Sequence, residues 1–395
     1  MRKIFTLLAA VLLCAAMAQP AFAGQCMVRG ENYSIGAKGA VVMEAQTGRV
    51  LFAENADHRL PMASTTKIMT ALLTLEQPEL DEEFEVDSQA IITEGSSMGL
   101  MEGDIATLRA LAGGMMMASG NDGANAAAVR IAGSMEDFSQ LMNERAAQIG
   151  MKNTHFVTPS GLDDKEHYST AYDMALLARE ALKNPDFAQM ATSKRLTLTY
   201  GNPPYKRTLA NHNRLLSSYP GAVGVKTGFT KKSGRCLVSA ATKNGVTLII
   251  VTLNCGNDWN THAALYDRYF AMVESVEVTP EKPIMVPVTG GTLPYTQAKQ
   301  ISPVTAVSIA GEKPQVHYTI YAPFFLYAPV LGGDIVGKIV YDRDGIIIGE
   351  SMLAAAVPVP ALPSEPEPEP GLWQRIADWW NELAEKDTEQ PHLGG

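Results

Sequence analysis

Three short polar motifs in this chain have residue types that could together perform an acyl transfer. They are Ser64-Thr65-Thr66-Lys67, Ser119-Gly120-Asn121 and Lys226-Thr227-Gly228. A serine hydroxyl is a weak nucleophile, and a neighbouring lysine can activate it when the lysine amine is neutral. Each motif alone is weak, because Ser-x-x-Lys recurs by chance, Ser-Gly-Asn is typical of turns and Lys-Thr-Gly of surface loops. Their order and surroundings favour one catalytic cleft.

The first motif opens a predicted helix, because residues 65–76 are apolar at helical intervals. If this helix begins near Ser64, then Ser64 and Lys67 share one face, one turn apart, and the amine reaches the hydroxyl oxygen. Burial and a second cation, for which Lys226 is the candidate, would lower the pKa of Lys67 and make it a base. Backbone N–H groups at the helix start would favour developing negative charge.

The second motif follows an apolar run over residues 108–118. A loop after a helix would therefore present its side chains to the cleft. Ser119 could pass a proton toward the leaving group, and Asn121 could hydrogen-bond Lys67 and the substrate backbone.

The third motif begins a predicted strand. An Asn-Gly pair at 244–245, between two apolar runs, predicts a hairpin within residues 226–254. A strand that lines the cleft could pair with an extended substrate. There Lys226 and Thr227 would hold a substrate carboxylate, and Gly228 would permit a close approach.

With these motifs the sequence resembles the D-alanyl-D-alanine carboxypeptidases, the low-molecular-mass penicillin-binding proteins. The resemblance covers about residues 30–275 and includes the segments 44–51, 59–70, 150–156, 160–163, 168–177 and 224–230. It implies the fold shared by penicillin-binding proteins and β-lactamases. It also implies removal of the terminal D-alanine from peptidoglycan pentapeptides, with β-lactams as inhibitors that acylate the same serine.

The resemblance gives each matching residue a role. Ser64 would be the acylated nucleophile, Lys67 its base, Ser119 and Asn121 the second catalytic element, and Lys226 and Thr227 the carboxylate-binding pair. The backbone N–H groups of Ser64 and Phe229 would form the oxyanion hole. Some relatives also have an arginine after the second hairpin strand that helps to hold the carboxylate. Residues 254–257 read Asn-Cys-Gly-Asn here, so we do not carry that role over.

Three alternatives stay open. A β-lactamase could use the same motifs, although no Glu-x-x-Leu-Asn sequence lies between Ser119 and Lys226. A D,D-endopeptidase would act on cross-links. A wall-binding module without catalysis is the third, and the intact set of motifs argues against it.

The N-terminus predicts export. Arg2 and Lys3 precede an apolar run, and Ala21-Phe22-Ala23 gives residues 1–23 the form of a signal peptide. The run is short for a spanning helix. We therefore expect the protein at the outer face of the cytoplasmic membrane, in the cell wall or in the periplasmic space. The mature chain keeps three cysteines, which we expect to be apolar core residues rather than a disulfide.

Composition excludes some classes of function. The net charge is −10, which disfavours nucleic-acid binding. The histidines and cysteines are scattered, so we expect neither a metal site nor a cofactor.

The chain is predicted to be α+β, with an antiparallel sheet flanked by helices. Residues 24–275 form the catalytic domain, which includes a helix opened by the capping pattern at Thr170 and Asp173. Residues 276–356 alternate in polarity and predict a small C-terminal β domain. Residues 357–370 form a Pro/Glu linker.

Residues 371–386 predict a terminal amphipathic helix with a Trp-rich stripe. The resemblance implies that it is a membrane anchor. Its charge disfavours binding to anionic lipid, because the chain from Glu365 onward contains eight acidic residues and only two basic ones. Docking on protein is the alternative.

Overall fold

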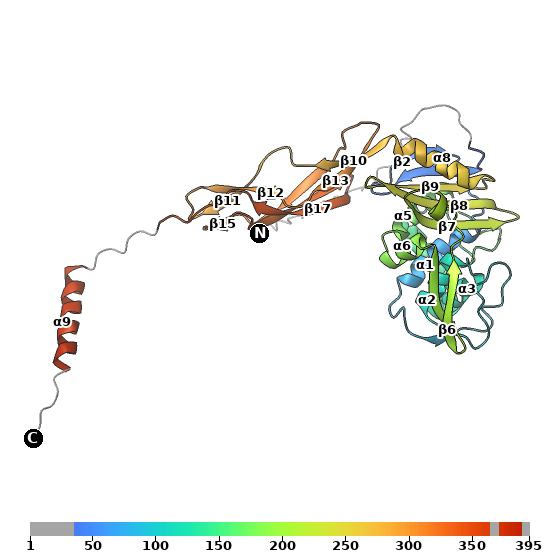
Figure 1. Cartoon of the computed structure of the whole chain (residues 1–395), viewed down its shortest axis with the longest axis horizontal. Helices are drawn as coiled ribbons and strands as arrows, with labels where there is room; N and C mark the ends of the chain where they lie inside the picture. The colour runs from blue at the N-terminus through green and yellow to red at the C-terminus, as the bar shows by residue number, and fades with distance from the viewer. Residues whose placement is uncertain (1–34, 364–370, 389–395) are drawn as a thin grey trace, which may run out of the picture. The chain divides into compact units, whose positions relative to one another are not determined.

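The computed structural model describes residues 35–363 and 371–388. The predicted signal peptide, Cys26 and residues 364–370 of the predicted linker lie outside the described residues. The chain divides into two compact units (Figure 1). The first runs to Val276 and also includes Thr305–Gln315, and the second contains Glu277–Val304 and the residues from Val316 onward.

The first unit is built on a five-stranded antiparallel sheet in the order β2-β1-β9-β8-β7. This confirms the predicted α+β class and the predicted hairpin, which turns at Asn244 and Gly245. The strand with the third motif starts four residues earlier than predicted, so Lys226 lies in its middle. The strands are β1 (Gly39–Glu44), β2 (Val50–Glu54), β7 (Ala222–Thr230), β8 (Gly234–Lys243) and β9 (Val246–Leu253).

Both faces of this sheet are buried. Because side chains alternate along a strand, Ile249 and Val251 of β9 face one hydrophobic core and Leu248 and Ile250 face another. The second core is closed by α8 (Asp258–Phe270), and the first by the helices between residues 67 and 192 (Figure 1). Cys236 and Cys255 are free and buried, as expected for core residues.

Four of the helices over the first core begin at polar caps. The Thr170 hydroxyl accepts a hydrogen bond from Asp173 N at 3.0 Å, which confirms the predicted cap, and Thr107, Ser134 and Asn184 cap other helices in the same way. The helices over the first core are α1 (Lys67–Leu75), α2 (Leu108–Met117), α3 (Asn121–Ala132), α4 (Met135–Ile149), α5 (Ala171–Ala181) and α6 (Pro185–Thr192). The short helix α7 (Leu215–Ser218) contributes Leu215 to the second core.

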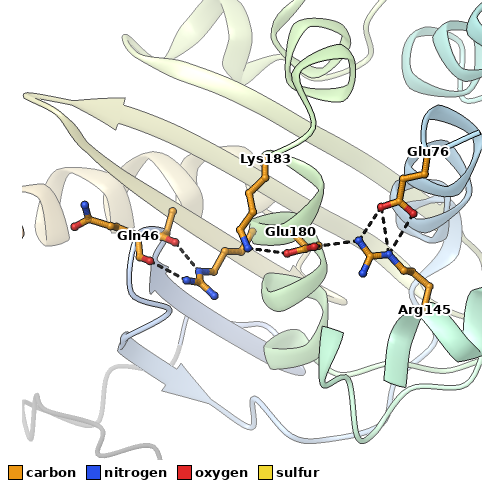
Figure 2. Close-up of polar contacts among 7 residues, drawn as sticks. Gln46, Glu76, Arg145, Glu180 and Lys183 are labelled. Atoms are coloured by element: carbon orange, nitrogen blue, oxygen red, sulfur yellow. Dashed lines mark hydrogen bonds and ion pairs between the residues drawn. The ribbon is translucent and has the colours of Figure 1, made fainter. Parts of the chain in front are cut away.

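Ion pairs join three of these helices. Arg145 of α4 donates to Glu76, at the end of α1, at 2.7 Å, and to Glu180 of α5 at 3.0 Å (Figure 2). Lys183 also donates to Glu180, at 2.8 Å. Arg179 donates to the backbone carbonyls of residues 45 and 46, which lie in the turn between β1 and β2. The helical layer is thereby fixed to the sheet that holds the third motif.

A second hairpin of the first unit was not predicted. Strands β5 (Arg195–Gly201) and β6 (Pro204–Ala210) pair with each other. On its other side β5 pairs with β4 (Ile105–Ala106), which in turn pairs with β3 (Phe84–Glu85). Leu198 of β5 packs against α2 at Gly113, where an added Cβ would lie 2.8 Å from it. This hairpin therefore supports the helix that precedes the second motif.

The second unit contains a six-stranded sheet in the order β14-β16-β17-β12-β11-β15. Its strands are β11 (Ile284–Thr289), β12 (Tyr295–Gln300), β14 (His317–Tyr321), β15 (Leu326–Tyr327), β16 (Ile335–Arg343) and β17 (Ile346–Ala355). They form the small C-terminal β domain that the sequence predicts.

Two boundaries differ from the prediction. Residues 305–315 were placed in the β domain, but they belong to the first unit, because β13 (Val304–Ile309) pairs with β10 (Val273–Val278) and buries Val307 and Ile309 in its second core. The predicted linker began at Val357. However, Val359 exchanges backbone hydrogen bonds with Val330, and Leu362 N donates to Gly290 O, so these residues belong to the sheet.

The terminal helix is α9 (Leu372–Thr388). Leu372, Trp373, Trp379 and Trp380 are exposed on it. Among the described residues, no helix is long and apolar enough to cross a bilayer.

Candidate active site

Ser64 lies in a short 3-10 turn, Ala63–Thr66, that leads directly into α1. The hydroxyl of Thr65 donates to Met62 O at 2.6 Å, and that of Thr66 donates to Ala63 O at 2.8 Å, so the turn is held from both sides. Ala63 has a φ of 49°, a left-handed conformation that is costly for a residue with a Cβ. The backbone is therefore forced into one shape immediately before the predicted nucleophile.

Lys67 is fully buried and has three polar neighbours. Its Nζ lies 3.1 Å from Ser64 Oγ, 2.6 Å from Asn121 Oδ1 and 2.5 Å from the carbonyl oxygen of Ser160. The amide and carbonyl oxygens can only accept hydrogen bonds, so they take two N–H groups of the amine. A neutral amine has only two, and its lone pair is then left for the proton of Ser64. This geometry suits a general base.

The electrostatics of the site favour that neutral form. Burial lowers the pKa of Lys67 well below its usual range, and the charge of Lys226 lowers it further, whereas Asp122 raises it. This agrees with the expected effect of burial and a second cation.

The second motif joins α2 to α3. Ser119 has a φ of 57°, again a left-handed conformation, and Asn121 is the first residue of α3. The side chain of Asn121 is fixed at both ends, because its Oδ1 accepts from Lys67 and its Nδ2 donates to Glu94 O at 2.7 Å.

Asp122 positions the loop beside this motif, which sequence reasoning missed. Its carboxylate accepts hydrogen bonds from Ser97 Oγ at 2.6 Å and from the backbone N–H groups of residues 98, 99 and 100 at 2.9–3.0 Å. The neighbouring residue Ser96 lines the cleft. An acidic residue directly after the second motif was the available signal.

The third motif brings β7 against the turn that holds Ser64. Lys226 Nζ donates to Ser119 Oγ and to Thr227 O, both at 3.0 Å, and burial lowers its pKa to about 7. A Cβ added at Gly228 would lie 2.9 Å from Met62 O and 3.1 Å from Ser64 N. Only glycine allows this approach. Phe229, the next residue, has an exposed side chain, and the role of its backbone N–H in an oxyanion hole stays a prediction.

These motifs meet at one cleft of about 360 Å³. Ser64, Ser119 and Thr227 line it with Gly228 and Phe229, whereas Lys67 and Asn121 lie behind them. The structure thus brings together every predicted site residue. The other residues that line the cleft are Ser96, His212, Arg214, Arg235, Cys236, Asp258 and Trp259.

Arg235 is a cation of the cleft that sequence reasoning did not identify. It lies on β8, opposite Phe229. Its Nε and Nη2 donate to Asp258 Oδ1 at 3.1 and 2.8 Å, and its Cζ lies 5.5 Å from the ring centroid of Trp259. The sequence signal was weak, because this arginine is nine residues beyond Lys226 and only the pairing of β7 with β8 brings it to the cleft.

A loop from residue 157 to 167 closes the base of the site. His167 Nδ1 accepts from Val157 N at 2.9 Å, so its Nε2 carries the proton and donates to Thr66 Oγ1 at 2.8 Å. Burial lowers the pKa of His167 to about 4, which keeps the ring neutral. Gly161 packs on Ala63, so this loop positions both the Ser160 carbonyl and the nucleophile turn.

The described residues contain no group of His, Cys, Asp and Glu that could hold a metal ion.

A family model described as D-alanyl-D-alanine carboxypeptidase matches residues 26–257, which is more than half of the chain. The chain is also similar to D-alanyl-D-alanine carboxypeptidase DacF of Bacillus subtilis. The two are 33% identical over 365 residues, which cover 90% of this chain and 93% of that protein.

Two further relatives bear on function. A D-alanyl-D-alanine endopeptidase of Pseudomonas aeruginosa is 32% identical over 243 residues, which cover 61% of this chain and 78% of that protein. The crystal structure of penicillin binding protein 5 from Haemophilus influenzae has a TM-score of 0.59 and 28% identity, and it covers 84% of this chain and 99% of that one. The match of the family model and the extent of these similarities show that this chain belongs to the D-alanyl-D-alanine carboxypeptidase family.

Proposed function

We propose that this protein is a serine D-Ala-D-Ala carboxypeptidase that removes the terminal D-alanine from peptidoglycan pentapeptides and binds β-lactams at the same site. The observation that carries the proposal is the position of the buried Lys67 amine, 3.1 Å from Ser64 Oγ. Its two N–H groups already donate hydrogen bonds to Asn121 Oδ1 and Ser160 O. A base in this position has one available partner, the Ser64 hydroxyl.

The reaction has two halves. Ser64 Oγ attacks the carbonyl carbon between the two D-alanines while Lys67 takes its proton. The N–H groups of Ser64 and Phe229 stabilise the oxyanion. The proton reaches the departing amine through Ser119, whose hydroxyl accepts from Lys226, and free D-alanine leaves. Water then hydrolyses the ester on Ser64 and restores the enzyme.

The substrate carboxylate lies against β7 and β8 in this proposal. Thr227 offers a hydroxyl, and Lys226 contributes positive charge from behind the strand. Arg235 adds a guanidinium that Asp258 and Trp259 hold in place. This residue takes the part that the stretch 254–257 could not supply.

A labelled penicillin tests the nucleophile. The wild-type protein should be labelled and should release D-alanine from a pentapeptide, and Ser64→Ala should do neither, because Ser64 alone forms the covalent bond. Ser96→Ala is a matched control, since Ser96 lines the same cleft and should still label. Labelling of the Ser64→Ala protein would reject the assignment.

An endopeptidase acting on cross-links is the second candidate, because a D-alanyl-D-alanine endopeptidase is among the relatives of this chain. A cross-linked muropeptide and a pentapeptide, supplied at equal concentration, separate the two. Much faster hydrolysis of the cross-linked substrate would favour the endopeptidase.

A β-lactamase is disfavoured by the cleft itself. Among the described residues that line it, Asp258 is the sole carboxylate, and it is bonded to Arg235. No carboxylate is therefore placed to activate a water on the acyl-enzyme, and we expect the penicilloyl ester to persist.

We further propose that the protein is exported and that α9 contacts the membrane surface. The signal-peptide form of residues 1–23 and the exposed tryptophans of α9 support this. Truncation after Pro370 should reduce vesicle binding and leave activity on a soluble peptide intact. The acidic residues predict tighter binding to neutral than to anionic vesicles at low salt. Equal flotation of full-length and truncated proteins would favour docking on protein.

A further inference from the structure

Three segments of the second unit lack ionisable side chains. The segments 283–298, 318–333 and 351–364 contain no Asp, Glu, Lys, Arg or His. In the whole chain 19% of residues are charged, so three such segments in one small unit are unusual.

Backbone hydrogen bonds bring these segments together. Val288 of β11 pairs with Leu326 of β15, Gly291 bridges to Ala361, and Val330 bridges to Val359. We call the surface that they form the apolar end. It consists of the turn between β11 and β12 with Tyr295, the segment that runs from β14 through β15 to Gly333, and the residues that follow β17.

Large side chains of the apolar end are exposed rather than buried. Phe324, in the loop before β15, is 98% exposed, and Tyr327, the last residue of β15, is 75% exposed. The exposed large side chains of this surface include Leu293, Tyr295, Phe324, Phe325, Tyr327, Leu331, Val357 and Leu362. An exposed apolar group of this kind marks an interaction surface.

The chain leaves the second unit from this surface. Leu362, whose N–H donates to Gly290 O, is followed by eight residue steps from Pro363 to Gly371. Eight steps span at most about 29 Å. The start of α9, with exposed Leu372 and Trp373, is therefore tethered within that distance of the apolar end.

We infer that the apolar end is a second membrane-contact surface, which inserts Phe324, Tyr327 and Leu331 into the interface of a neutral bilayer. The inference rests on the proposed function only for the position of the enzyme at a membrane. Stable attachment usually takes two signals, and the acidic residues around α9 weaken it as a single anchor.

The chemistry favours lipid over a protein partner. The three segments hold no charged side chain, so the lipid headgroups would meet no unpaired charge on them. A carboxylate, that of Asp334, borders the surface and accepts a hydrogen bond from Leu331 N at 2.7 Å. Phenylalanine, leucine and tyrosine are the side chains that enter the lipid interface.

Flotation with phosphatidylcholine vesicles tests the inference on the full-length chain. The double variant Phe324→Ser with Tyr327→Ser should bind the vesicles about tenfold more weakly, because it lacks the two aromatic side chains that would enter the bilayer. The matched control is Ile301→Ser with Ile347→Ser. Both isoleucines are exposed, and they lie at the ends of β12 and β17 away from the apolar end. The control should bind like the wild type.

Activity on a soluble pentapeptide and thermal unfolding should be unchanged in both double variants, which shows that they fold. Equal vesicle binding by the aromatic variant and the wild type would overturn the inference. A second result would also overturn it: the aromatic variant loses a self-association that the wild type shows, while its vesicle binding stays intact. That result would assign the surface to contact with protein.

Truncation after Pro370 separates the two membrane contacts. The truncated protein should retain weak vesicle binding, and the aromatic substitutions should abolish it. If truncation leaves vesicle binding unchanged, the proposal for α9 fails. The proposal for the apolar end then depends on vesicle binding by the Phe324→Ser, Tyr327→Ser variant alone.

Discussion

Replacing Lys67 tests the central step of the proposed reaction. A positioned general base contributes about 10²–10⁴-fold to rate, which corresponds to about 2.7–5.4 kcal/mol of activation free energy. Because Nζ of Lys67 is within hydrogen-bond reach of Ser64 Oγ and its N–H groups are occupied by Asn121 and Ser160, no other described group at this position can take the proton. We expect Lys67→Ala to slow acylation by a fluorescent penicillin by about this factor.

The variant Lys67→Arg distinguishes a base from a fixed positive charge. A guanidinium keeps its proton because its pKa lies above 12. If Lys67 is the base, Lys67→Arg should be as slow as Lys67→Ala. The assay is stopped-flow acylation, with thermal unfolding measured in parallel because Lys67 is fully buried. Acylation of a folded Lys67→Arg protein at a rate near that of the wild type would refute the reasoning.

Four further predictions concern the third motif and the hairpin β7–β8. The rate of acylation should rise with pH as Lys67 loses its proton. The variant Lys226→Gln should move this rise to higher pH, because the charge of Lys226 lowers the pKa of Lys67. A pH profile of acylation that the substitution leaves unmoved would contradict this. Thr227→Val should weaken turnover of substrates with a free carboxylate more than that of amidated analogues, measured as kcat/KM, and equal losses would reject the carboxylate role. Arg235→Gln should show the same selectivity and raise KM. Gly228→Ala should lower stability by about 1–3 kcal/mol and slow acylation, since its Cβ meets backbone, whereas Gly256→Ala, with open space around it, should do neither.

Much of the site could be predicted because its parts are local. Ser64 and Lys67 are one helical turn apart, so their contact follows from a helix alone. The hairpin at Asn244 and Gly245 followed from turn chemistry, and the two faces of its strands from alternation. The order of the motifs was sufficient to place them in one cleft.

The parts that could not be predicted depend on pairing between distant strands. Arg235 reaches the cleft because β8 runs antiparallel to β7, and its own neighbours in sequence show no catalytic pattern. Hairpin β5–β6 alternates Leu196, Leu198 and Tyr200, but it follows a helical region and was not assigned. Residues 305–315 belong to the first unit because Val307 and Ile309 pack in its second core. The sequence around these residues does not indicate this distant contact.

The two buried lysines are linked through their protons. A charged Lys226 lowers the pKa of Lys67, because two positive charges in one buried site disfavour each other. By thermodynamic reciprocity, deprotonation of Lys67 must raise the pKa of Lys226 by the same amount. The pair therefore favours one charged and one neutral amine, so that a single buried site can offer both a cation and a base.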